Sequence, residues 1–105
     1  MIYWEKESLR DREKLFEFLY LHHPVVANKT DDLIVAKVTA LESHPNMGVQ
    51  RDDMPGRLLI LPDISMVVVY VVVPHTRTTQ QNTNSTQDIK ILRVLHQKRP
   101  FPLTD

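Results

Sequence analysis

The chain has 105 residues, 42% of them hydrophobic and 25% charged, which is ordinary for a soluble globular domain. Thirteen basic residues balance thirteen acidic ones, which argues against a protein that binds nucleic acid through overall positive charge. Cysteine is absent, so disulfides and thiolate metal sites are excluded and an intracellular protein is favoured.

The first predicted elements are a short strand and a helix. Ile2-Tyr3-Trp4 is aromatic and β-branched, which is typical of a strand. A helix is expected from about 7 to 21, with Ser8 as its cap and Asp11 as the partner in a short capping box. Its apolar residues follow one helical stripe and its charged residues lie largely elsewhere. These apolar residues are Leu9, Leu15, Phe16, Phe18 and Leu19.

A second helix is expected after the LHHP break. Pro24 disfavours helical geometry at His23 and suits the first turn of a new helix. An apolar stripe then continues from Val25 to Leu41, and the helix should end near Ser43. The pattern predicts two antiparallel helices joined by a short turn.

The remainder of the chain is predicted to form strands. Residues 57–61, 65–73 and 88–95 are rich in β-forming residues. Between the last two lies a polar, turn-rich insert at about 74–87, which is expected to be an exposed loop. The order β-αα-βββ indicates a single α+β domain over residues 1–105, with a two-helix N-terminal hairpin packed on a small, mostly antiparallel sheet.

The strand at 66–73 reads MVVVYVVV and is apolar on both faces. Two helices can cover only one of these faces. The other should be covered by loops, by a second copy or by another protein, unless the terminal segments of the chain cover it. The run has eight residues, too few to cross a membrane, and charges by the fifth residue argue against a signal peptide. We therefore expect a cytoplasmic protein with no membrane partner.

Candidate chemistry is concentrated near the end of the chain, in RVLHQKRPFP at 93–102. The sequence has no Gly-rich phosphate loop, nucleophile elbow or recognisable metal spacing, so we expect no cofactor and no metal. Strand alternation puts Arg93 and His96 on opposite faces, and only Lys98 shares a face with His96. A histidine beside cations suits RNA cleavage, whereas a partly buried histidine bonded to a neighbouring loop is the structural alternative. Arg57 could bind a phosphate or pair with nearby aspartates.

Several stretches together resemble the RelE/ParE superfamily of bacterial toxins. They are the β-αα-βββ order, the opening IYW, the helix SLRDREKLFEFL, HP before a PGR turn, a strand with tyrosine and the ending ILRVLHQKRPFP. Members are toxins of type II toxin–antitoxin modules, held inactive by an antitoxin encoded beside them. The resemblance implies a cognate antitoxin as partner, a homodimer or a hetero-oligomer with the antitoxin, and operator DNA contacted only through the antitoxin.

The superfamily has two functional branches. RelE-like toxins cut mRNA in the ribosomal A site and carry cations where this chain has Leu59, Leu61 and Val67. ParE-like toxins trap DNA gyrase with cleaved DNA, need no catalytic group, and resemble this chain better at its C-terminal end. The resemblance therefore favours a ParE-like gyrase inhibitor.

The resemblance also gives expected site residues. The predicted target-binding residues are Arg93, His96, Lys98, Arg99 and Phe101. The alternative is a ribosome-dependent mRNA endonuclease, with His96 as general acid or base and Arg57 and Arg99 on phosphate. A third possibility is an inactive relative that binds only its antitoxin and operator complex.

Overall fold

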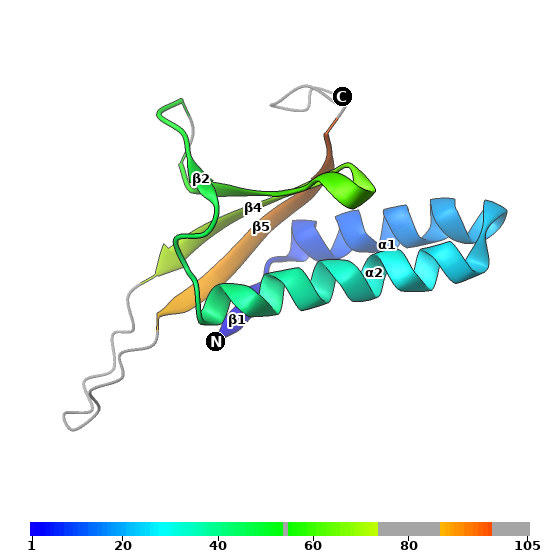
Figure 1. Ribbon diagram of the computed structural model, residues 1–105, viewed down its shortest axis with the longest axis horizontal. Helices are drawn as coiled ribbons and strands as arrows, with labels where there is room; N and C mark the ends of the chain where they lie inside the picture. Colours follow the sequence, from blue (N-terminus) through cyan, green and yellow to red (C-terminus); the bar gives the residue numbers. More distant parts are fainter. Residues whose placement is uncertain (54, 74–86, 98–105) are drawn as a thin grey trace.

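The computed structural model describes residues 1–53, 55–73 and 87–97, which form two layers (Figure 1). Two antiparallel helices lie on one face of a five-stranded sheet built from this part of the chain. The elements in chain order are β1 (Ile2–Trp4), α1 (Lys6–His22), α2 (Pro24–Thr39), the 3-10 turn η1 (Ala40–Glu42), β2 (Val49–Gln50), β3 (Arg57–Leu61), the 3-10 turn η2 (Pro62–Ile64), β4 (Met66–Val73) and β5 (Asp88–His96).

The strands lie in the order β1-β5-β4-β3-β2. β1 pairs with β5 in parallel, and the other neighbours are antiparallel. The predicted α+β fold is confirmed, as are both helices and all four expected strands. β2 was not predicted, because two residues are too few to show an alternating pattern. Apart from residue 87, the predicted polar insert lies outside the described residues.

The start of α1 differs from the prediction. The helix begins directly after Glu5, whose backbone N–H donates to the Ile91 carbonyl of β5 at 2.9 Å. Ser8 lies inside the first turn, fully buried, and its hydroxyl donates to the Glu5 carbonyl at 2.6 Å. The capping prediction is therefore wrong, because pairing of β1 with β5 fixes where the helix starts. The Asp11 carboxylate binds Arg93 of β5 instead.

One arginine joins both helices to the first strand. The Arg12 guanidinium donates to both Asp31 carboxylate oxygens, at 2.9 and 2.8 Å, and lies 4.5 Å from the centre of the Trp4 ring. A bidentate pair combined with a cation–π contact fixes the hairpin against β1. No helix in the described ranges is long and apolar enough to cross a membrane.

Apolar side chains on both faces of β4 are buried. On the helix-facing side they join one core, whose fully buried members include Ile34, Leu41, Val68, Tyr70, Ile89 and Ile91. On the opposite side, Leu58, Val67, Val69 and Leu95 form a second cluster with exposures of only 4–7%. The two apolar faces are confirmed. Because the second cluster is already buried in the isolated chain, it does not require a second copy or another protein to cover it.

Candidate functional site

The structure places three of the candidate site residues, Arg93, His96 and Arg57. Arg93 and His96 lie on β5, and Arg57 begins β3. The other three, Lys98, Arg99 and Phe101, lie outside the described residues. In the described ranges, no three His, Asp or Glu side chains lie close enough together to hold a metal ion.

Arg93 is bound by a carboxylate of the first helix. Its guanidinium donates to both oxygens of Asp11, at 2.7 and 3.0 Å, and the same carboxylate accepts the Val94 backbone N–H at 2.9 Å. β1 pairs with β5 only as far as Ile91, so at Val94 no described strand lies on this side. Asp11 occupies that open edge and is only 12% exposed, whereas the Arg93 side chain is 36% exposed. The Asp11 carboxylate thus fixes the C-terminal half of β5 to α1.

His96 is the last residue of β5. It lies on the opposite face of the sheet from Arg93. It pairs with Met66, which belongs to the helix-side core, while Arg93 pairs with Val69 of the second cluster. Residues directly paired across strands share a face, so the register agrees with the predicted separation. His96 is partly buried, and the next residue anchors the strand end through a 2.8 Å bond from the Gln97 N–H to the Ser65 carbonyl.

Arg57 binds a backbone loop. Its guanidinium donates to the carbonyls of Gly48, at 2.8 Å, and Asn46, at 3.4 Å. The neighbouring Tyr70 hydroxyl accepts the Gly48 N–H at 2.8 Å and donates to the Pro45 carbonyl, also at 2.8 Å. Burial raises the pKa of the Tyr70 hydroxyl further above its ordinary value, so the hydroxyl that donates to Pro45 stays protonated even in moderately alkaline solution. Arg57 and Tyr70 together hold the loop at 45–50 in place.

The sheet register separates Arg57 from His96. Arg57 pairs with Tyr70 and His96 pairs with Met66, four residues away on β4. Four residues of strand span about 13 Å, and the two side chains also belong to strands on opposite sides of β4. A general acid or base and a phosphate-binding cation must both reach one scissile bond. This separation gives no support to a shared catalytic site for these two residues.

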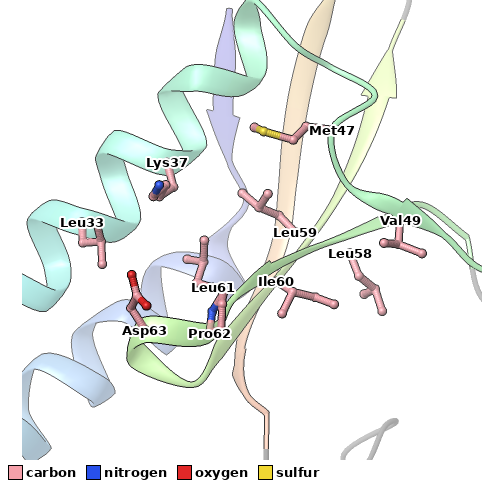
Figure 2. A pocket seen from close by; sticks show the side chains of 10 residues that line it. All are labelled: Leu33, Lys37, Met47, Val49, Leu58, Leu59, Ile60, Leu61, Pro62 and Asp63. Carbon is pink, nitrogen blue, oxygen red and sulfur yellow. The ribbon is translucent and has the colours of Figure 1, made fainter.

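An apolar groove runs between α2 and the edge of β3 (Figure 2). Its lining residues are Leu33, Lys37, Met47, Val49, the strand residues Leu58, Leu59, Ile60 and Leu61, and Pro62 and Asp63 of η2. β2 pairs with β3 only at Arg57 and Leu58, so the rest of this β3 edge has no partner strand in the described ranges. Figure 2 shows Leu59 and Leu61 directed towards α2, and Ile60 to the other side. An unpaired edge with apolar side chains on both sides suits an added strand.

The sequence did not predict this groove. Met47, Val49 and Ile60 are 46%, 55% and 47% exposed, which is unusual for neighbouring large apolar side chains. Met47 and Val49 lie in the stretch HPNMGVQRDDMPG at 44–56, between the expected end of the second helix near Ser43 and the predicted strand at 57–61. Two apolar residues spaced by one position in that stretch were the available signal for a short edge strand.

A family match covers nearly the whole chain. Residues 2–101 match the family described as "ParE toxin of type II toxin-antitoxin system, parDE". The chain belongs to the ParE toxin family. Among solved structures, a chain of the chromosomal ParDE toxin–antitoxin system from P. aeruginosa is similar, with a TM-score of 0.68 and 22% identity over 90% of this chain and 92% of that chain. The search among curated proteins found no match.

The ParE match confirms the branch of the superfamily that the sequence resembles. A toxin of a toxin–antitoxin system implies an antitoxin as its partner. In this ParE-family toxin, the three positions where the RelE-like branch would carry cations are buried. Leu59, Leu61 and Val67 are 6%, 4% and 5% exposed and belong to the two apolar clusters.

Proposed function

We propose that this ParE-family toxin inhibits DNA gyrase and that its cognate antitoxin neutralises it. Burial of Leu59, Leu61 and Val67 is the observation that carries the choice of gyrase over mRNA. Side chains at these positions face the interior, so these three positions do not supply cations for RNA phosphates, which supports gyrase as the target. Binding to gyrase requires only a complementary surface.

The proposed gyrase contact is the C-terminal end of β5 and the residues that follow it. His96 is the last strand residue and is partly exposed. The proposed contact residues are Arg93, His96, Lys98, Arg99 and Phe101, in a stretch where cations have no acidic neighbour in sequence. The Arg93 guanidinium already binds Asp11, so its part in the contact is chiefly to hold the strand end in position.

Substitution of His96 distinguishes a contact residue from a catalytic one. We expect His96→Ala to weaken inhibition of gyrase supercoiling about tenfold, which corresponds to the 1–2 kcal/mol typical of one interface contact. The measurement is the concentration of purified toxin that halves supercoiling. Lys90→Ala, at an exposed cation in the first half of β5, is the control and should leave this concentration unchanged. Complete loss of toxicity with a folded His96→Ala protein would instead indicate a catalytic histidine.

The proposed antitoxin site is the groove between α2 and β3. An extended antitoxin segment can add to the β3 edge through backbone hydrogen bonds and place apolar side chains against Met47 and Ile60. Leu61 of β3 and His96 of β5 both pair with Met66, from opposite sides of β4. Two strand spacings amount to about 10 Å, so an antitoxin at the η2 end of the groove would obstruct a large target approaching His96.

Ile60 provides a direct test of this antitoxin site. Ile60→Asp places a charge at a 47% exposed groove position and should weaken antitoxin binding about 10- to 100-fold, because burial of one isoleucine contributes about 1.5–3 kcal/mol. Titration calorimetry with the antitoxin encoded beside the toxin measures the effect. Leu9→Asp is a matched control, since Leu9 is also 47% exposed but lies on α1. Equal affinities for the two variants would place the antitoxin elsewhere.

A further inference from the structure

The groove between α2 and β3 carries one charge towards each of its ends (Figure 2). Of the ten residues that line it, two are charged, Lys37 and Asp63, and the others are apolar. Lys37 lies about one helical turn beyond Leu33, towards the end of α2 that leads into the loop with Met47. Asp63 lies in η2, which follows the opposite end of β3. The groove is therefore apolar along its length, with a cation towards one end and an anion at the other.

These two charges are not paired within the described part of the chain. Both side chains are exposed, and in the described ranges neither has a hydrogen-bond or ion-pair partner. By contrast, the Arg12 guanidinium between the two helices binds both oxygens of Asp31. Lys37 and Asp63 are therefore available to pair with charges on a molecule that enters the groove.

An antitoxin segment that fills the groove would remove both charges from water. A charge that loses its water without gaining an opposite charge costs free energy, and this cost rises in apolar surroundings. The same surroundings strengthen the attraction between opposite charges that are placed close together. The apolar walls therefore favour a segment that brings a negative charge to Lys37 and a positive charge to Asp63.

We propose that Lys37 and Asp63 determine, by charge, which antitoxin this toxin binds. The segment in the groove carries an acidic side chain next to Lys37 and a basic one next to Asp63, with apolar side chains between them. This inference rests on the proposed antitoxin site and adds the chemistry of its occupant. A segment with a basic side chain next to Lys37 brings like charges together, so the groove rejects antitoxins of that pattern.

Reversal of each charge tests the proposal. Lys37→Glu should raise the dissociation constant for the antitoxin encoded beside the toxin at least about tenfold, measured by titration calorimetry. Lys29→Glu is the matched control, because Lys29 is exposed on the same row of α2, outside the groove, and its reversal changes the net charge equally. It should leave the affinity unchanged. Asp63→Lys should likewise weaken binding, and Asp32→Lys, at an exposed position outside the groove, should not.

Salt dependence and a double-mutant cycle show whether charge itself causes the loss. The effect of Lys37→Glu should shrink as ionic strength rises from about 0.1 M to about 1 M, because the Debye length falls from about 10 Å to about 3 Å. A loss of packing alone would not respond to salt in this way. One acidic residue of the antitoxin should also be coupled to Lys37. Its alanine variant should weaken binding to the wild-type toxin but not to Lys37→Ala.

The outcomes separate this inference from the proposed antitoxin site. Equal affinities for Lys37→Glu and Lys29→Glu, with binding weakened in Ile60→Asp, would overturn selection by charge and leave the site in place. Full affinity in both Lys37→Glu and Ile60→Asp would overturn the site as well. A loss in Lys37→Glu that is the same at low and high salt would also contradict selection by charge.

Discussion

Replacement of Asp11 by alanine is expected to lower the free energy of unfolding by about 2–3 kcal/mol. The substitution leaves the Arg93 guanidinium and the Val94 N–H without the carboxylate that now binds both. The bonds to Arg93 are charge-assisted because they join a guanidinium and a carboxylate. They are also shielded from water on the Asp11 side, because Asp11 is only 12% exposed. For a domain of this size, the melting temperature should fall by roughly 10 °C, measured by thermal denaturation.

An exposed pair of the same chemistry provides the matched control. Arg51 and Asp53 also form a bidentate pair, at 2.9 and 2.6 Å, but their side chains are 45% and 63% exposed. Asp53→Ala should therefore leave the melting temperature nearly unchanged, because water and salt weaken exposed ion pairs. If Asp11→Ala and Asp53→Ala destabilise the chain equally, Asp11 does not anchor the β5 edge. The Asp11 variant should also inhibit gyrase less, because the end of β5 loses its attachment to α1.

Substitution of Tyr70 by phenylalanine has the second large expected effect. The ring would still fill the core, but the Gly48 N–H and the Pro45 carbonyl would lose their shared partner. Tyr70 is fully buried, so water cannot readily replace the hydroxyl, and we expect a loss of about 2–3 kcal/mol in chemical denaturation. The same change leaves Arg57 as the remaining side chain that holds the loop carrying Met47 and Val49, so the loop should loosen and the affinity for the antitoxin should fall as well.

Tyr3→Phe is the control for the Tyr70 prediction. Tyr3 is 44% exposed, and its hydroxyl can exchange bonds with water, so its removal should change stability by less than about 0.5 kcal/mol. Tyr70→Phe with wild-type stability but reduced antitoxin affinity would show that the tyrosine orders the loop without stabilising the fold. Unchanged values for both properties would contradict its role in holding the loop.

The helices and strands of this fold could be predicted because their signals depend only on residues that are close together in the sequence. The apolar stripe of α1 shows the 3.6-residue period of a helix, and the eight-residue apolar run of β4 is typical of a strand that is buried on both faces. The start of α1 was misplaced because Glu5 is bonded to Ile91, far along the chain. No capping pattern near Ser8 could reveal a boundary that a distant strand determines.

The site residues were less predictable than the fold for the same physical reason. Arg93 and His96 were correctly assigned to opposite faces of one strand, since strand alternation needs only their spacing. The Asp11 contact with Arg93 joins residues 82 positions apart and is created by the packing of α1 beside β5. The groove likewise depends on β2 ending after two residues, which leaves the edge beyond Leu58 unpaired.

The most direct test of the proposed function is the addition of purified toxin to DNA gyrase and relaxed plasmid, with and without the cognate antitoxin. We predict inhibition of supercoiling and accumulation of gyrase-linked cleaved DNA, both reversed by the antitoxin. A parallel translation reaction should leave its mRNA intact. Fragmented mRNA in that reaction, with gyrase activity unaffected, would contradict the proposal and identify the protein as a ribosome-dependent endonuclease.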